Sequence, residues 1–135
     1  MKRVKLVYIV EDDPIAAMIA EEVLLRNNVA ADIQIYVNGE RAFERLADAV
    51  RTGGDLPDLI LLDLNMPLMD GWEFLEAFAD LGIRKPVPIF VLTSSIRPDD
   101  RERALRYVAV RGYFPKPLSD ATVALIQPLL PVGPT

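Results

Sequence analysis

The chain has 135 residues, 51% of them hydrophobic and 26% charged, which is typical of one globular domain. It contains no cysteine and no histidine, which excludes a thiol nucleophile, a disulfide framework, a cysteine zinc site and a histidine base. The formal charge of −5 argues against direct nucleic-acid binding, because that binding depends on lysine and arginine at the phosphates. Any chemistry must therefore use carboxylates, hydroxyls, lysine and bound hard cations.

The N-terminal segment has a basic start and then a short apolar run from Leu6 to Val10. A signal peptide needs a longer apolar stretch, and a membrane helix needs about 20 apolar residues. We therefore expect a cytoplasmic protein without membrane insertion. Because no repeat or linker interrupts the sequence, we predict one domain over residues 1–130 and a short tail over residues 131–135.

Strand-like and helix-like segments alternate along the chain. Short runs of apolar and β-branched residues predict strands, and apolar residues that recur every three or four positions predict amphipathic helices. Strands are expected at Lys5–Val10, Asp32–Val37, Leu59–Asp63, Pro88–Ser94 and around Gly112–Phe114. Helices are expected after Pro14, at Glu40–Arg51, Gly71–Gly82 and Asp99–Tyr107, and from a cap at Ser119 to Pro128.

This alternation predicts an α/β fold, a doubly wound five-stranded parallel sheet with helices on both faces. Crossovers are right-handed, so helices reach both faces only if the strand order reverses, as in the flavodoxin-like order 2-1-3-4-5. The reversal lies between the first and third strands, and ligands bind beyond their carboxyl ends. Glu11 and Asp12 follow the first strand and Asp63 ends the third, so these acids should converge there.

Carboxylates crowded at one point favour a hard divalent cation, because their mutual repulsion is relieved when they bind it. Mg²⁺ takes oxygen ligands in near-octahedral geometry and keeps several waters, so two carboxylates and one backbone carbonyl suffice. We predict Mg²⁺, with Mn²⁺ as an alternative, held by Asp12 and Asp63 directly, by the main-chain oxygen of Asn65, and by Glu11 through water.

Two further strand ends carry groups that phosphoryl chemistry requires. The fourth strand ends at Thr93, whose hydroxyl can contact a phosphoryl oxygen, and Lys116 follows the fifth strand. With a carboxylate nucleophile and Mg²⁺, these groups would hold a transferring phosphoryl group in line and neutralise its oxygens.

The motifs at these strand ends resemble those of the receiver domains of two-component response regulators. VEDDP, LLDLNMPLMDG, LTSS and YFPKP lie at the ends of the first, third, fourth and fifth strands in that family's order, and the likeness covers about residues 4–127. Among receivers the chain is most similar to stand-alone, chemotaxis-type regulators. The resemblance implies a signalling domain and not an enzyme, in which Asp63 accepts a phosphoryl group from a sensor histidine kinase or a histidine phosphotransfer protein.

The resemblance also implies a conformational switch made by Thr93 and Tyr113. This switch would act on the face formed by the fourth helix, the fifth strand and the fifth helix. The Lys116–Pro117 peptide bond is expected to be cis. Output is expected to pass to a separate effector protein or along a phosphorelay, and a homodimer is left open.

Three features depart from the family pattern. The segment Val108–Gly112 lacks the Gly-Ala pair that often precedes the fifth strand, Pro98 stands where the fourth helix should begin, and the fifth helix looks short. All three touch the surface with which receivers meet partners, so the sequence leaves partner identity open.

Two other classes of protein share part of this pattern. Phosphatases of the haloacid dehalogenase type use an aspartyl nucleophile and Mg²⁺, but they carry Asp-x-Asp on the first strand, whereas here the residue two after Asp63 is Asn65. Flavin-binding modules share the topology, but they need a phosphate loop rich in serine, threonine and glycine, and the acids after the first strand would repel a phosphate.

Several residues near these motifs have simpler expected roles. Asp70 is expected to cap the third helix, Asp13 to be a solvated residue at the start of the first helix, and Trp72 to be partly buried. A solvated basic face is expected from Arg97, Arg101, Arg103 and Arg106.

Overall fold

The computed structural model describes residues 3–95 and 97–131. Its strands are β1 Val4–Val10, β2 Ala30–Tyr36, β3 Leu59–Leu62, β4 Ile89–Thr93 and β5 Val110–Pro115. Its helices are α1 Pro14–Arg26, α2 Gly39–Thr52, α3 Gly71–Leu81, α4 Pro98–Leu105 and α5 Asp120–Ile126, followed by a 3₁₀ turn, η1, at Gln127–Leu129. The predicted sequence of strands and helices is confirmed. Most of the predicted tail, residues 132–135, lies outside the described residues.

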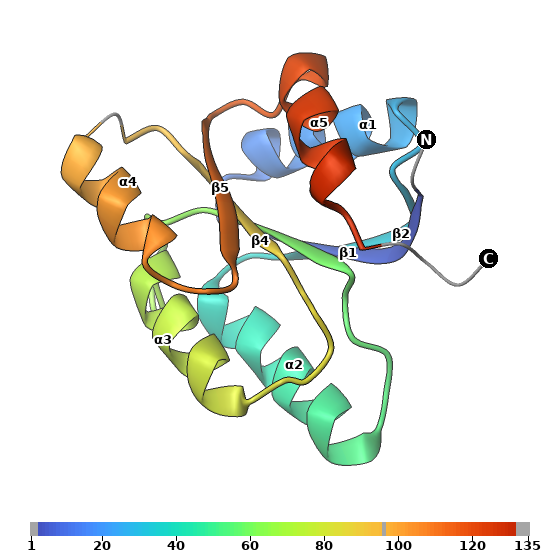
Figure 1. Ribbon diagram of the computed structural model, residues 1–135, viewed down its shortest axis with the longest axis vertical. Helices are drawn as coiled ribbons and strands as arrows, with labels where there is room; N and C mark the ends of the chain where they lie inside the picture. Colours follow the sequence, from blue (N-terminus) through green and yellow to red (C-terminus); the bar gives the residue numbers. More distant parts are fainter. Residues whose placement is uncertain (1–2, 96, 132–135) are drawn as a thin grey trace.

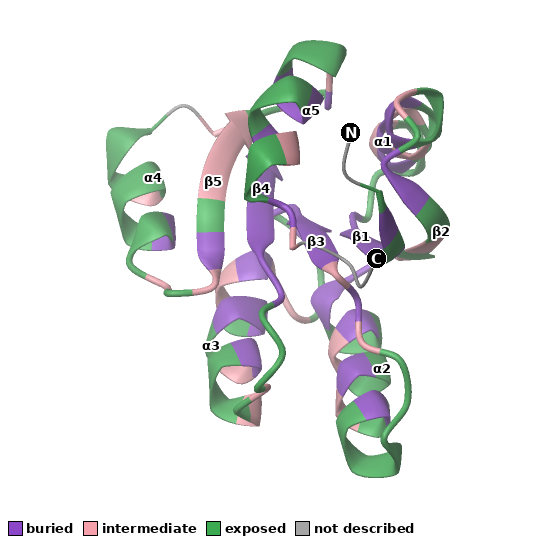
Figure 2. Cartoon of the chain, turned by 45° about the vertical axis from the view of Figure 1, so that its right-hand side comes forward, coloured by how far each residue is buried: buried purple, intermediate pink, exposed green. Residues whose placement is uncertain are grey.

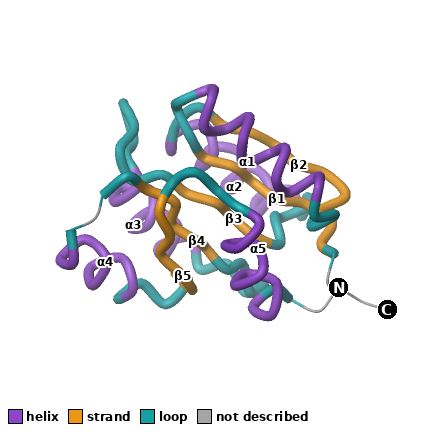
Figure 3. The backbone as a smooth tube through the Cα atoms, turned by 90° about the horizontal axis from the view of Figure 1, so that it is seen from above, coloured by secondary structure: helices purple, strands orange, loops and turns teal. Residues whose placement is uncertain are grey.

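All five strands pair in parallel in the predicted order, β2-β1-β3-β4-β5. Helices α1 and α5 cover one face of this sheet, and α2, α3 and α4 cover the other (Figure 1). Seen from above, the strands form one twisted layer with β2 and β5 at its edges (Figure 3). The strand order reverses between β1 and β3, which places a crevice beyond their carboxyl ends.

An apolar core lies on each face of the sheet. Leu24 and Phe90 belong to the core beneath α1 and α5, and Leu46 and Phe74 belong to the core beneath α2 and α3. The central strands β3 and β4 are buried along their whole length, whereas the outward faces of the helices are exposed (Figure 2). Full burial of each large apolar side chain stabilises the fold by about 1.5–3 kcal/mol, which explains why these strands are continuous apolar runs.

Side-chain caps fix the starts of the helices nearest the crevice. Asp13 is exposed as expected, and it also caps α1 by accepting hydrogen bonds from the backbone N–H groups of Ile15 and Ala16. Asp70 caps α3 in a reciprocal capping box with Glu73, which confirms its expected role. Each such cap contributes about 1 kcal/mol.

The edge of the sheet at β5 differs in detail from the prediction. Helix α4 begins at Pro98 itself, one residue early, because the first helical position needs no backbone N–H donor. Strand β5 extends further at both ends than the Gly112–Phe114 segment expected. Helix α5 is short, as expected, but Pro128 lies within η1, so the chain passes through a 3₁₀ turn after the α-helix ends.

The basic residues of α4 do not form a purely solvated face. The guanidinium carbon of Arg103 lies 4.0 Å from the centre of the Trp72 ring on α3, and Trp72 is half-buried as expected. This cation–π contact fastens α4 to α3 and contributes about 0.5–1 kcal/mol. None of the helices in residues 3–95 and 97–131 combines the length and the apolarity that crossing a membrane requires.

A half-buried carboxylate, Asp58, connects the segment before β3 to the start of β1. Asp58 Oδ2 accepts hydrogen bonds from the backbone N–H groups of Lys5 (2.9 Å) and Leu6 (3.1 Å), and Lys85 Nζ lies 2.5 Å from Oδ1. Burial alone raises the pKa of Asp58, but the hydrogen bonds from Lys85 and the two amides outweigh it. The pKa of this carboxyl therefore lies below its ordinary value.

Asp58→Asn is expected to destabilise the fold by about 1–3 kcal/mol near neutral pH, because the amide cannot accept all of these hydrogen bonds. The folded-state pKa of Asp58 is lowered, so its contribution is present above the unfolded-state pKa of about 3.9 and is lost as pH falls through the folded-state value. Urea unfolding of both proteins should show a difference in the free energy of unfolding that is constant from about pH 7 to about pH 5 and narrows at lower pH. The neighbouring exposed Asp55→Asn is the control, and a pH-independent gap would contradict the assignment.

Candidate functional site

Three carboxylates meet beyond the carboxyl ends of β1 and β3. One oxygen each of Glu11, Asp12 and Asp63 lies within 4.8 Å of the others. The backbone brings them together, because Asp63 N donates to the carbonyl of Val10 at 3.0 Å and so continues the pairing of β3 with β1. Asp63 and Glu11 are buried, with 3% and 6% of their surface exposed, whereas Asp12 is exposed to solvent.

Lys116 brings a positive charge to the two buried acids. Its Nζ lies 2.6 Å from Glu11 Oε1 and 3.3 Å from Asp63 Oδ2. Its position follows from the backbone after β5, where Lys116 N donates to the carbonyl of Thr93 at 3.1 Å and the Lys116–Pro117 peptide bond is cis. The structure therefore places a cation, a carboxylate and the end of β4 around one point.

The electrostatics of the site reflect its burial. The pKa of Glu11 is raised to about 7, because burial and the nearby charge of Asp63 raise it more than the hydrogen bonds from Lys116 and the Asp13 amide lower it. Burial lowers the pKa of Lys116, but the hydrogen bond to Glu11 and the charge of Asp63 outweigh it and raise the net value. Lys116 therefore stays protonated and positively charged at neutral pH. The site contains three acidic side chains and one basic side chain.

The donor set fits a hard divalent cation. It offers three carboxylates within 4.8 Å, and hard cations such as Mg²⁺ and Mn²⁺ prefer oxygen ligands. Lys116 approaches Asp63 at Oδ2, and the other oxygen of this carboxylate can serve as a ligand for the cation. Asp12 faces solvent, so an ion can enter with waters still bound. Glu11 was expected to act through water, and in the structure its direct partners are Lys116 and the backbone N–H of Asp13.

A close backbone approach shapes the loop that follows Asp63, where the exposed Asn65 also lies. Gly71 N donates to the carbonyl of Leu64 at 3.0 Å. A Cβ atom on Gly71 would lie 2.5 Å from the carbonyl oxygen of Asp63 and 2.6 Å from the Cα of Leu64, so a larger residue would displace the loop. The sequence signalled a turn at this glycine but not that the turn supports Asp63.

The peptide groups of Ser95 connect the two predicted switch residues. The buried Thr93 Oγ1 accepts a hydrogen bond from Ser95 N at 3.1 Å, and the half-buried Tyr113 donates its hydroxyl to Ser95 O at 3.3 Å. The side chain of Ser95 donates to Asp100 Oδ2 on α4 at 2.7 Å. Sequence reasoning missed the bridging roles of Ser95 and Asp100, because short polar residues before a helix indicate only a turn or a cap.

Comparison with known proteins identifies the family. The sequence profile of the response regulator receiver domain matches residues 7–126. The probable methanogenesis regulatory protein FilR2 of Methanothrix harundinacea is 32% identical over 114 residues, which cover 84% of this chain and 73% of that protein. The chain spans about half, 54% and 55%, of the length of two further curated relatives.

Solved structures agree with this result. A two-component response regulator from Cytophaga hutchinsonii has the same fold, with a TM-score of 0.86 at 24% identity over 94% of this chain and 96% of that chain. The Mn²⁺-bound form of response regulator Rcp1 gives a TM-score of 0.73 at 27% identity over 93% of this chain and 91% of that chain. The chain therefore belongs to the response regulator receiver domain family, whose members serve two-component signalling.

Proposed function

We propose that Asp63 is the phosphoacceptor of this receiver domain, and that it takes a phosphoryl group from a phosphohistidine on a sensor kinase or a phosphotransfer protein. The observation that carries the proposal is the grouping of a buried Asp63 with Glu11, Asp12 and Lys116 beyond the carboxyl ends of β3, β1 and β5. Two acids to bind a cation, one acid to attack and one ammonium to neutralise charge are the parts that phosphoryl transfer needs.

Transfer of the phosphoryl group to Asp63 forms one bond and breaks one. A carboxylate oxygen of Asp63 attacks phosphorus and forms a P–O bond, while the P–N bond to the donor imidazole breaks and its electron pair leaves with the nitrogen. Lys116 neutralises the phosphoryl oxygens, and the Thr93 hydroxyl can contact one of them. Mg²⁺, when bound by Glu11, Asp12, Asp63 and the Asn65 carbonyl, would supply further neutralising charge. The Mn²⁺-bound form of Rcp1 supports this part of the proposal.

The same site is proposed to act as a switch. Thr93 Oγ1 is held by Ser95 N in the unmodified protein, and Tyr113 is held by the carbonyl of the same residue. A phosphoryl oxygen on Asp63 would draw the Thr93 hydroxyl away from Ser95 and release this connection. Because Ser95 also bonds Asp100 on α4, the release would favour a second packing of α4, β5 and α5.

Thr93→Ala is expected to accept the phosphoryl group but to uncouple it from the α4–β5–α5 face, because the hydroxyl senses the phosphoryl oxygen and does not attack. In the wild type, the NMR chemical shifts of Tyr113 and α4 should change on addition of beryllofluoride and Mg²⁺. In the variant, the same chemical shifts should change very little. The exposed Ser94→Ala is the matched control and should respond as the wild type does. A full response of Thr93→Ala would show that the signal takes another route.

The test of the function as a whole is intact mass spectrometry after incubation with Mg²⁺ and acetyl phosphate. A receiver should gain one phosphoryl group and lose it in hydroxylamine, as acyl phosphates do. A phosphatase would instead consume the donor without accumulating the adduct, and a flavin-binding module would do neither. An unchanged mass, with Mg²⁺ binding demonstrated separately, would contradict the proposal.

The proposed organisation is a single receiver domain over residues 1–130 that passes its signal to a separate effector or along a phosphorelay. The regulatory name of FilR2 and the matched receiver profile support a signalling role. The motif likeness to stand-alone regulators supports transfer of the signal between chains. Size-exclusion chromatography with and without beryllofluoride would show whether a homodimer forms in the process.

A further inference from the structure

A second concave site lies at the end of the sheet opposite Asp63. Its walls come from α3, from the connection between α3 and β4, from the connection between α4 and β5, and from η1. Both connections lead into the amino ends of parallel strands, whereas Asp63 lies beyond the carboxyl end of β3. The cleft has a volume of about 650 Å³, within the range of roughly 300–1,000 Å³ that small-molecule sites occupy.

The walls of this cleft are mainly apolar. Phe78 lines it from α3, Tyr107 and the 96% exposed Val108 line it from the α4–β5 connection, and Leu129 lines it from η1. Tyr107 is fixed in place by a hydrogen bond of 2.5 Å from its hydroxyl to Glu76 Oε1 on α3. Fixed aromatic walls and an exposed valine favour an occupant with an apolar body.

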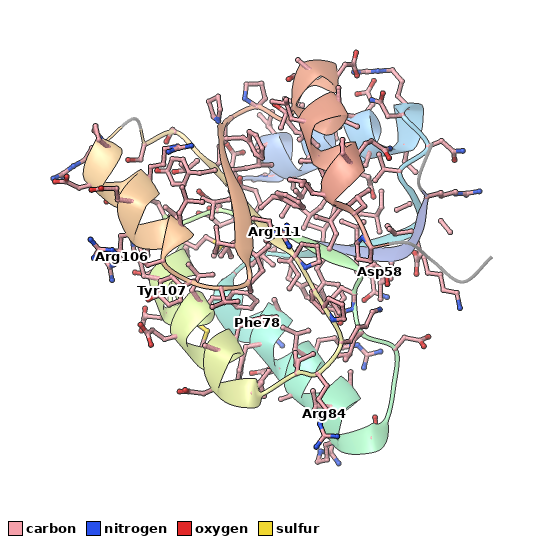
Figure 4. The ribbon with its side chains drawn as sticks, in the orientation of Figure 1. Asp58, Phe78, Arg84, Arg106, Tyr107 and Arg111 are labelled. Atoms are coloured by element: carbon pink, nitrogen blue, oxygen red, sulfur yellow. The ribbon has the colours of Figure 1, made fainter. Side chains whose placement is uncertain are left out.

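The charged side chains that line the cleft are all basic, and two acids, Glu76 and Asp58, contact the lining residues Tyr107 and Lys85. Among the residues that the structure describes, its charged lining residues are Arg84, Lys85 and Arg111 and include no acid, although the whole chain carries a net charge of −5. Asp58 neutralises Lys85, while Arg84 and Arg111 are exposed. Figure 4 shows Arg111 on β5, on one side of Phe78 and Tyr107. Arg84 lies beyond the end of α3. The uncompensated charge of the cleft is therefore positive.

We propose that this cleft binds a small organic acid whose apolar body lies against Phe78 and Tyr107 and whose anionic group pairs with Arg111 or Arg84. The volume favours a small molecule, and the lining charge selects an anion over a neutral or cationic compound. Binding here leaves Asp63 untouched, so the proposal stands apart from phosphorylation and fails or succeeds separately from it.

The test is a ¹H–¹⁵N NMR titration of the unphosphorylated protein with 2-naphthoate, an aromatic body bearing a carboxylate. The expected result is saturable shifts of amides in α3, the α3–β4 connection and the α4–β5 connection. The neutral 2-naphthamide, similar in shape, should bind about tenfold more weakly because it lacks the charge. Equal affinities, shifts without saturation, or shifts centred elsewhere would overturn the proposal.

Paired variants test separately how the arginine charges and the open volume of the cleft contribute to binding. Arg111→Met together with Arg84→Met should weaken naphthoate about tenfold without affecting naphthamide, whereas the exposed Arg101→Met should change neither. The exposed Ala79→Trp should fill the cleft and block both probes, and Ala124→Trp on exposed α5 surface is its control. Asp63→Asn should bind naphthoate as the wild type does.

The same spectra also test the competing occupant. If these amides shift with protein concentration in the absence of a probe, a second copy of this chain covers the cleft, and the small-acid proposal is overturned. Concentration-independent spectra together with the paired-variant result would support it.

Discussion

Asp63→Asn is expected to abolish phosphorylation by acetyl phosphate and Mg²⁺ while the protein stays folded. The amide has nearly the shape of the carboxylate, but it lacks the nucleophilic oxygen that must form the new P–O bond. It also removes one of the acids crowded near Glu11, so little stability should be lost. Intact mass spectrometry should show no adduct, and circular dichroism should match the wild type.

The control for this variant is Asp70→Asn. Asp70 belongs to the same connection between β3 and α3, where it caps α3, and asparagine caps a helix about as well as aspartate. This variant should be phosphorylated as the wild type is. If Asp63→Asn still gained one acid-stable, hydroxylamine-sensitive phosphoryl group, another carboxylate would have to be the acceptor.

Mg²⁺ is expected to stabilise the wild-type fold by mass action, by about 2.7 kcal/mol at a hundredfold excess over Kd. Asp12→Ala should remove most of this response, because Asp12 is one of the expected direct ligands of the ion and the exposed member of the acid cluster. The variant should also be more stable than the wild type without metal, since it relieves repulsion with Glu11 and Asp63. Thermal unfolding with and without Mg²⁺ measures both effects.

A matched charge removal away from the site shows whether the effect is local. Asp32→Ala takes one exposed carboxylate from β2, on the edge of the sheet, and should leave the Mg²⁺ response intact. If the wild type were indifferent to millimolar Mg²⁺, or if both variants lost the response equally, the metal assignment would be wrong.

The fold could be predicted from sequence because each element carries its own local signal. The run Leu59–Leu62 is apolar at every position, which is typical of a parallel strand covered on both faces. The spacing of Asp70 and Glu73 is typical of a capping box and predicts the start of α3. Boundaries at the edge of the sheet were less accurate. The length of β5 depends on its pairing with β4, and the 3₁₀ turn after α5 depends on packing around Pro128.

The site was predictable in its members but not in its contacts. Strand order alone brings Glu11, Asp12 and Asp63 to one crevice, so their grouping follows from topology. The pairing of Lys116 with Glu11, and the bridge through Ser95, depend on side-chain directions and loop geometry that sequence spacing does not encode. The cleft at the far end joins segments whose individual residues show no functional motif.

The identity of the phosphoacceptor can be measured directly by reducing the phosphorylated protein with borohydride, which converts an aspartyl phosphate to homoserine. Peptide mass spectrometry then locates the converted residue. Asp63 as the acceptor predicts homoserine at position 63 and unchanged residues at Glu11, Asp12 and Asp13, with conversion dependent on both Mg²⁺ and the phosphoryl donor. Conversion at Asp12 or Asp13, with position 63 unchanged, would contradict the assignment of Asp63.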